Sequence, residues 1–336
     1  MGTAQPWQVA RCPTGETGRD LVATYLIRRI STLAATLIAA SVVVFLLLAV
    51  LPGKPAQVIL GTQATPQSVA QLTKQLGLDA PLWRQYVNWV HGLVTGHFGN
   101  SYISQLPIGH QIAQSLAVTA PLIVLGLIIG LAIAVPFGVA AALLRRRGAG
   151  ALIASTTQIG IAVPNFIAGL VLILVFAVKL SWLPASGFVT WSSDPWLAFK
   201  SLVLPAVALG VVEGAVLSRY VRSAVLDVLR SDYLRTARAK GLNRRQALVR
   251  HGFRNGSIPV LTVLGLEIPS LIVGAVVVES VFTLPGVGTL LLQAVANRDL
   301  IVVEDIVMLI AVTVLAVNFL VDVSYRLLDP RIGAAR

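Results

Sequence analysis

Long apolar segments separated by short polar ones recur along this chain of 336 residues. A helix needs about 20 mostly apolar residues to cross a bilayer, and six segments approach or exceed that length. They lie at 26–51, 116–143, 152–178, 201–218, 258–281 and 306–328. The pattern predicts an all-α polytopic membrane protein with six transmembrane helices.

Prolines and small residues interrupt these segments without ending them. Pro205 lies in the fourth and shortest segment, and membrane helices tolerate proline when neighbouring helices satisfy the freed carbonyl groups. Two glycine pairs have a spacing of four residues, Gly126 with Gly130 and Gly210 with Gly214. Small residues at this spacing let two helices approach closely, so we expect both pairs to mark helix–helix contacts.

The polar stretches divide the chain further. Residues 1–25 mix Pro, Gly and Thr with charges and are interpreted as a loosely ordered leader, after which 26–51 is a retained helix because no cleavage site follows it. Residues 52–115 contain two stretches with helical spacing, Pro near the start and Gly near the end, which predict a small helical segment. Residues 116–328 then form a five-helix core with a polar loop at 219–257, and 329–336 form a tail.

Composition and charge support a membrane protein and orient it. The chain is 56% hydrophobic and 12% charged, with a mean hydropathy of +0.82, which is too apolar for a soluble domain. The net charge is +12. If the N-terminus is cytoplasmic, 20 of the 26 Lys and Arg residues face the cytoplasm. Basic residues concentrate on that side, so we expect both termini and the 219–257 loop inside and 52–115 outside.

The sequence contains no motif for catalysis or metal binding. There is no G-x-x-x-x-G-K-[ST] phosphate loop, no H-E-x-x-H and no G-x-S-x-G, and the four histidines are dispersed. Cys12 is the one cysteine, so no intrachain disulfide is expected. We therefore expect this chain not to be an enzyme and to bind no cofactor or metal.

Four carboxylates fall within the predicted spans: Glu213, Glu267, Glu279 and Asp322. A charge at the bilayer centre costs about 2.5–3.5 kcal/mol on insertion scales, so these groups should face protein or water. Glu279 and Asp322 lie near span ends, whereas Glu213 and Glu267 lie deeper. Glu213, Glu267 and Glu279 are candidates for a translocation path, with structural pairing between helices as the alternative.

The stretch TARAKGLNRRQALVRHGFRN, residues 236–255, carries six basic residues and no acid. Ser231 is a possible N-cap for a first helix, and Gly241 has the position of a left-handed residue that ends it. Asn243 with Gln246 forms a capping-box pattern for a second helix. The pattern predicts a helix, a turn and a second helix.

Three interpretations of this element remain open on its residues alone. A DNA-binding helix-turn-helix fits the pattern, but tethering to membrane spans at both ends disfavours it. A helix on the lipid surface, held by anionic headgroups, is the second. A docking element for a cytoplasmic partner is the third. Arginine is enriched on the cytoplasmic side in any case, so charge does not discriminate between them.

The stretch DYLRTARAKGLNRRQALVRHGFRNGSIPVLT, residues 232–262, resembles the cytoplasmic signature loop of binding-protein-dependent ABC transporter permeases. It is most similar to the dipeptide/oligopeptide family. The general pattern is E-A-A, three residues, Gly, nine residues and I-x-L-P. Gly241 matches the glycine, and the departure at the I-x-L-P positions is one that the peptide subfamily shares. The residues that the resemblance assigns to ATPase coupling are Arg235, Thr236, Ala237, Arg238, Ala239, Lys240, Gly241, Leu242, His251 and Arg254.

Two further stretches resemble the same family. LGLDAPLWRQYVNWVHGLVTGHFGNS is similar to its outside segment, with His97 where an aspartate is usual. VVVESVFTLPGVGTLLLQAVANRD resembles its E-x-V-F-x-x-P-G-x-G segment at the outer end of the fifth span. The outer-gate residues that this motif implies are Phe282, Pro285, Gly286 and Gly288.

The resemblance implies a permease subunit with the type I ABC importer permease fold, in a bacterial inner membrane. It would form half of a pore with a second, related permease. Its other partners would be two ATPase subunits, or one fused ATPase, that use ATP and Mg, an extracytoplasmic substrate-binding protein and the lipid bilayer, but no nucleic acid. Di- or oligopeptides are the implied substrates, with nickel, a heme-like compound, glutathione or a sugar as alternatives. A proton-coupled secondary transporter using Glu213 or Glu267 is the alternative from another class.

Overall fold

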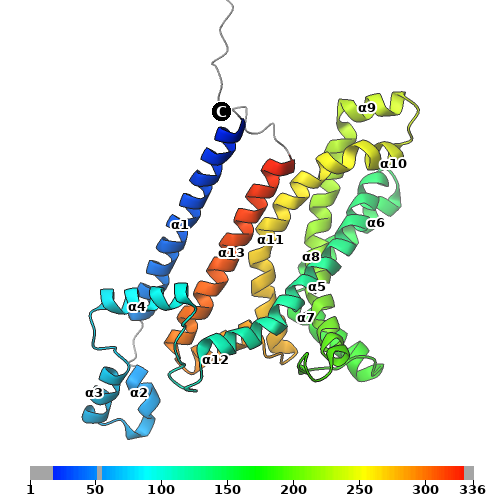
Figure 1. The fold of residues 1–336 in the computed structure, drawn as a ribbon. Coiled ribbons are helices and arrows are strands. Elements are labelled where there is room, and N and C mark those ends of the chain that lie inside the picture. Colours follow the sequence, from blue (N-terminus) through cyan, green and yellow to red (C-terminus); the bar gives the residue numbers. More distant parts are fainter. Residues whose placement is uncertain (1–17, 51–54, 329–336) are drawn as a thin grey trace, which may run out of the picture.

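The computed structural model describes residues 18–50 and 55–328, and residues 1–17, 51–54 and 329–336 lie outside the described part. Five long helices form the body of the molecule (Figure 1). They are α1 (Gly18–Val50), α5 (Ile108–Leu143), α8 (Pro195–Arg230), α11 (Phe253–Val281) and α13 (Leu300–Leu328). The shorter α-helices are α2 (Pro55–Leu60), α3 (Pro66–Gln75), α4 (Leu82–Thr95), α6 (Gly148–Ala162), α7 (Asn165–Leu172), α9 (Asp232–Ala239), α10 (Arg244–Ala247) and α12 (Val287–Ala296). A 3₁₀-helix covers Gly61–Gln63, and π-helical turns cover Ile173–Lys179 and Leu248–Gly252.

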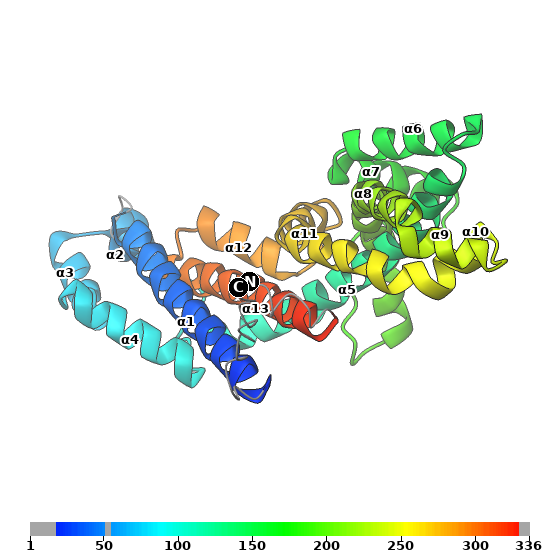
Figure 2. The same ribbon diagram turned by 90° about the horizontal axis from the view of Figure 1, so that it is seen from above.

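The short helices α6 and α7 lie against α8, whereas the others gather at the two ends of the long helices (Figure 1). One end carries α9 and α10, and we call it the α9 end. The opposite end carries α12, and we call it the α12 end; α2, α3 and α4 lie toward this end beside α1. Seen from above, α1 lies between α4 and α13 (Figure 2).

The five long helices are each apolar and long enough to span a membrane. Five of the six predicted spans are therefore found as helices in the described part of the chain, and all five helices are longer than predicted. The helix α1 begins at Gly18, within the predicted leader, and α5 begins at Ile108, within the predicted 52–115 segment. That segment contains α3 and α4, as expected from its helical spacing, and also α2, which was not predicted.

The span predicted at 152–178 is not one continuous helix. Its residues belong to α6 and to α7 with the π-helical turn that follows, and the two parts meet at an angle of 98°. Pro164 lacks the N–H that would continue α6 and disfavours a helical conformation at the preceding residue. Val163 accordingly has an extended backbone, with φ −86° and ψ 117°. A sixth span exists only if this bent pair counts as one.

The helices α5 and α8 pack along the predicted glycine pairs. A methyl group on Gly210 would lie 2.7 Å from the carbonyl oxygen of Gly126, and one on Gly214 would lie 3.0 Å from that of Gly130. Such distances leave no room for a side chain between the two backbones. The predicted contact is confirmed, and the glycines of one helix face those of the other.

Gly210→Ala is expected to destabilise the protein. Replacing glycine by alanine stabilises a helix by about 1 kcal/mol, but overpacking against the rigid backbone costs about 1–3 kcal/mol. The overpacking cost is the larger, so the free energy of unfolding should fall. The midpoint of thermal unfolding of the detergent-solubilised protein should fall. Gly148→Ala is the matched control, because a methyl group on Gly148 meets nothing within 4 Å. Equal midpoints for Gly210→Ala and the wild type would contradict the close approach of α5 and α8.

Candidate functional site

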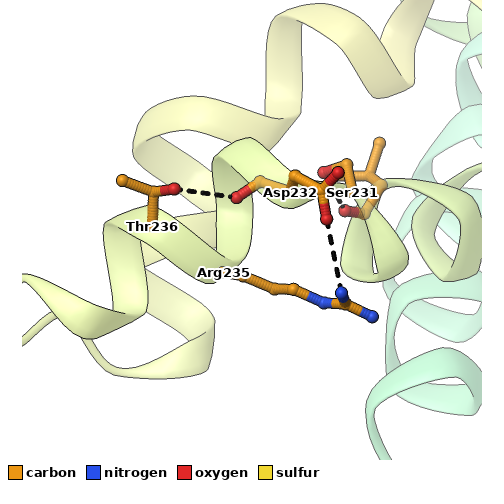
Figure 3. Close-up of polar contacts among 5 residues, drawn as sticks. Ser231, Asp232, Arg235 and Thr236 are labelled. Atoms are coloured by element: carbon orange, nitrogen blue, oxygen red, sulfur yellow. Dashed lines mark hydrogen bonds and ion pairs between the residues drawn. The ribbon is translucent and has the colours of Figure 1, made fainter.

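The α9–α10 element, residues 232–252, follows α8 after a sharp change of direction at Ser231, whose backbone is extended. The Ser231 hydroxyl donates to the carbonyl of Val228 at 2.6 Å, so the side chain closes α8 (Figure 3). Ser231 was also predicted as a possible N-cap of α9, but within the described residues its side chain makes no capping hydrogen bond to that helix. The first turn of α9 instead contains the Arg235–Asp232 ion pair at 3.3 Å and the Thr236 hydroxyl, which donates to the Asp232 carbonyl at 3.0 Å (Figure 3).

The turn between α9 and α10 has the predicted geometry. Gly241 has φ +94°, a conformation that other residues adopt only with strain. The Asn243 side chain accepts from the N–H of Gln246 at 2.8 Å, and the Gln246 side chain accepts from the N–H of Asn243 at 3.2 Å. This reciprocal pair is a capping box, so both sequence signals for the turn are confirmed.

One side of the element is apolar and buried against the bundle. Leu234 and Ala237 of α9 and Ala247 and Leu248 beyond the turn are all buried, in one cluster with apolar residues of α5 and α8. A methyl group on Gly252 would lie 2.7 Å from a methyl carbon of Val228, which brings the end of the element directly against α8. The element is therefore fastened to the bundle by packed side chains and is not a loose loop.

The opposite side of the element is polar and exposed. Of the residues expected to couple to an ATPase, five are exposed: Arg235, Thr236, Ala239, Lys240 and Gly241. Ala237 is buried and Leu242 is half-buried, so these two belong to the attached side. Side chains of the remaining three, Arg238, His251 and Arg254, lie outside the described part. Their backbones belong to α9, to the π-helical turn and to α11.

A second site lies at the α12 end, where the Glu279 carboxylate is fully buried. One of its oxygens accepts the N–H groups of Gly288 at 2.8 Å and Thr289 at 3.2 Å, in the first turn of α12. The other accepts the hydroxyl of Thr119 from α5 at 2.5 Å, and that hydroxyl oxygen accepts the N–H of Val287 at 2.8 Å. A carboxylate is stabilised at a helix N-terminus, where backbone donors and the positive end of the helix dipole meet. We call this arrangement the Glu279 junction, which joins α5, α11 and α12.

The rest of the E-x-V-F-x-x-P-G-x-G motif shapes this junction. A methyl group on Gly286 would lie 2.2 Å from the Glu279 carboxyl carbon, and one on Gly288 would lie 2.5 Å from the Cα of Val276. Phe282 is buried, and its ring lies 3.0 Å from where a methyl group on Gly169 of α7 would be. The two glycines are required because the carboxylate and the α11 backbone occupy the space that side chains would need.

The three acids proposed for a translocation path have different surroundings. Glu279 accepts the hydrogen bonds of the Glu279 junction, and this geometry favours a structural role in which it joins helices. Glu213 of α8 is buried, and its Oε2 has no hydrogen-bond partner among the described residues. Glu267 of α11 is half-buried and lies within electrostatic range of Glu213 and of Arg219. The structure therefore brings Glu213 and Glu267 close together between α8 and α11.

Asp322, the fourth acid within a predicted span, has a partner at the α9 end. Its carboxylate lies 2.8 Å from the guanidinium of Arg29, and the pair joins α13 to α1. Both side chains are partly exposed, and such pairs contribute about 0–1 kcal/mol. Structural pairing is the role that this contact supports.

The sequence interpretation missed a group of acids at the start of α13. Asp299 accepts the hydroxyl of Ser101 at 2.5 Å, and Asp305 accepts the indole N–H of Trp89 at 2.9 Å. Glu304 lies beside Asp305, just before the predicted span that starts at 306. Two adjacent acids at the beginning of an apolar helix are a sequence signal that could have identified this group. Among the described residues, no three His, Cys, Asp or Glu side chains are grouped so that they could hold a metal ion.

Comparison with known proteins finds matching families and relatives over nearly the whole chain. The family described as "Binding-protein-dependent transport system inner membrane component" matches residues 134–334, and the family of its N-terminal part matches residues 22–123. The probable peptide ABC transporter permease protein y4tP of Sinorhizobium fredii (strain NBRC 101917 / NGR234) is 38% identical over 310 residues, which cover 92% of this chain and 98% of that protein. The glutathione transport system permease protein GsiC of Escherichia coli (strain K12) is 38% identical over 308 residues, with the same coverage. The protein of that name from Salmonella typhimurium is 37% identical over 308 residues.

Glu279→Ala is expected to lower stability by about 3 kcal/mol or more. It leaves the donors from Thr119, Gly288 and Thr289 without their acceptor, and a hydrogen bond to a charged group contributes about 1.5–3 kcal/mol. The measurement is denaturant or thermal unfolding in detergent. Glu279→Gln should lose less, because one amide oxygen still accepts the two backbone N–H groups. Ser280→Ala is the control, since that exposed hydroxyl bonds only within its own helix. A Glu279→Ala protein as stable as Ser280→Ala would show that the Glu279 junction does not stabilise the protein.

Proposed function

Because this chain belongs to the family of binding-protein-dependent transport system inner membrane components and is a permease subunit of an ABC importer, we propose that it forms half of a pore for di- or oligopeptides. A second, related permease would form the other half. Two ATPase subunits, or one fused ATPase, would hydrolyse ATP with Mg, and an extracytoplasmic binding protein would deliver the solute. The observation that carries the proposal is the α9–α10 element, a packed helical pair with an exposed polar face.

We assign the α9 end to the cytoplasm of a bacterial inner membrane. The α9–α10 element carries a dense group of basic residues, and basic residues concentrate on the cytoplasmic side of membrane proteins. Both chain termini would then be cytoplasmic. The α12 end, together with α2, α3 and α4, would face the outside, where a binding protein would dock.

The α9–α10 element has the properties required to transmit force from an ATPase. Its exposed face offers Arg235 and Lys240 to acidic groups on a partner, and such charges give orientation more than affinity. Its buried face is packed on α8 through Leu234 and Ala237, and its chain continues without interruption into α11. A push on the element would therefore move α8 and α11 and would not be absorbed by a flexible loop.

Peptides are the substrate class that the relatives support. One relative is named a peptide permease and another a glutathione permease, and glutathione is itself a peptide. Nickel, a heme-like compound or a sugar are the alternatives for the same machinery. The test is to purify the whole complex and identify by mass spectrometry the solute that its binding protein carries. A peptide supports the proposal, and a sugar or a metal complex would refute it.

Gly241→Asp is expected to uncouple transport from ATP hydrolysis while the protein still inserts in the membrane. A side chain at φ +94° costs about 1 kcal/mol or more, and relaxing this strain turns the exposed face away from its partner. The measurement is ATP hydrolysis stimulated by the loaded binding protein in the reconstituted complex, which should fall at least about fivefold.

Gly148→Asp is the control for this experiment. It places the same acidic side chain at the start of α6, where a methyl group meets nothing within 4 Å, as at Gly241. Gly148 belongs neither to the α9–α10 element nor to the α2–α4 segment, so stimulated ATP hydrolysis should be unchanged. Stimulated ATP hydrolysis that survives undiminished in Gly241→Asp would show that the element has no coupling role.

A further inference from the structure

The short helix α4 has three faces of different character. Residues at positions i, i+4, i+7 and i+11 lie on one side of a helix, so each face is a row that recurs along it. One row contains Tyr86 and Trp89, which contact α1. The next row, which we call the apolar stripe, consists of Trp83, Val87, Val90 and Val94. The third row, which we call the polar stripe, consists of Arg84, Asn88, His91 and Thr95.

The apolar stripe is uncovered. Trp83 is 69% exposed, Val87 53% and Val94 82%, and only Val90 is half-buried. The polar stripe beside it is exposed along its whole length. A row of large apolar side chains left uncovered beside a polar row indicates a surface that binds a protein or a membrane.

Aromatic and polar contacts fasten α4 to two membrane helices. The hydroxyl groups of Tyr86 and of Ser41 in α1 lie 2.8 Å apart, and Phe45 of α1 stacks on Trp89 with ring centroids 6.1 Å apart. The indole N–H of Trp89 donates to the carboxylate of Asp305 in α13 at 2.9 Å. These contacts hold the row of Tyr86 and Trp89 against α1 and α13, so the position of α4 along both helices is defined.

That position lies within the apolar stretches of both helices. Ser41 precedes Val50, where the apolar stretch of α1 ends, by nine residues, and Asp305 follows Leu300, where that of α13 begins, by five. At 1.5 Å per residue, the two contacts lie about 14 Å and about 8 Å inside these stretches. Figure 1 shows that α4 runs across the direction of α1 at this level. A helix that lies across the membrane helices at such a depth is at the boundary between lipid and water.

The segment on the other side of α4 indicates the direction in which the apolar stripe faces. The Gln85 side chain donates to the carbonyl of Ala80 at 2.8 Å and to that of Leu78 at 3.3 Å, in the connection from α3. Successive helical residues are about 100° apart, so Gln85 lies about 160° around the helix from Trp83 and from Val87. The helices α2 and α3 lie beyond α4, farther from the middle of the long helices (Figure 1). The apolar stripe therefore faces toward the middle of the membrane.

We propose that α4 is an interfacial helix whose apolar stripe inserts into the lipid leaflet at the α12 end. Phospholipid is the occupant: its acyl chains contact Trp83, Val87 and Val94, and Arg84 of the polar stripe reaches its phosphate groups. Tryptophan is enriched at the level of the headgroups, and long basic side chains extend from there to the charged surface. The proposal concerns the contact of this chain with lipid and does not rest on which solute is transported.

The test measures the surroundings of single cysteines on α4 in the full-length chain, in nanodiscs and with Cys12→Ser. Val87→Cys and Val94→Cys report on the apolar stripe, and the adjacent Asn88→Cys and Thr95→Cys on the exposed polar stripe are the matched controls. Each cysteine carries a nitroxide spin label. Collisions of the label with oxygen, which concentrates in lipid, are compared with collisions with a nickel chelate, which stays in water. The ratio of oxygen to nickel collisions should be several-fold higher for the apolar stripe than for the polar stripe.

The same labels in the assembled complex separate lipid from a protein partner. With lipid as the occupant, the labels on the apolar stripe stay accessible to oxygen whether the binding protein is absent or present. Labels shielded from both oxygen and the nickel chelate would show that a protein covers the stripe, and this result would overturn the proposal. Equal collision ratios for the two stripes would overturn it as well, because the apolar stripe would then face water.

Trp83 provides a measurement that needs no cysteine variant. It is one of six tryptophans, and the fluorescence that Trp83→Phe removes from the wild type belongs to it. Lipids brominated on their acyl chains should quench this part of the fluorescence, whereas iodide, which stays in water, should leave it nearly unchanged. Quenching by iodide and not by the brominated lipids would contradict the insertion of the apolar stripe.

Discussion

The close contact between α5 and α8 is the constraint on which the rest of this structure depends. Gly210 and Gly214 lie so near the backbone of α5 that no side chain fits between the two helices. In a bilayer, where lipid is as apolar as a leucine side chain, such close packing is a main source of helix association. The helix α8 thus becomes an axis that extends from the α12 end to the α9–α10 element, and 72% of the residues in its apolar stretch are buried.

The two functional regions are attached to this axis in different ways. The α9–α10 element is held by apolar packing on α8, with its polar face free for a partner. At the other end, α11 reaches the Glu279 junction, where one carboxylate holds the first turn of α12 and the Thr119 hydroxyl of α5. Because α11 is continuous between the two regions, movement of the element, which we propose an ATPase drives, would be mechanically connected to movement of α12. The proposed coupling requires this mechanical connection through α11.

The sequence predicted what local signals determine. Apolar length predicted six spans, of which five are long helices; the glycine spacing predicted the α5–α8 contact, and the Asn243–Gln246 pattern predicted a capping box. Contacts between distant residues could not be predicted in this way. Thr119 and Glu279 are 160 positions apart, and Trp89 and Asp305 are 216 apart. The bend at Val163 was missed although Pro164 signals it, because prolines elsewhere in this chain, such as Pro205, lie inside unbroken helices.

Cysteine cross-linking in the assembled complex tests the central claim most directly, since the chain has a single native cysteine, Cys12, which Cys12→Ser removes. In that background Lys240→Cys, on the exposed face of the α9–α10 element, should cross-link to an ATPase subunit. Val94→Cys is the comparison, because Val94 is 82% exposed in α4 and should give no such product. Absence of the ATPase product from Lys240→Cys, or its equal formation from Val94→Cys, would contradict the account.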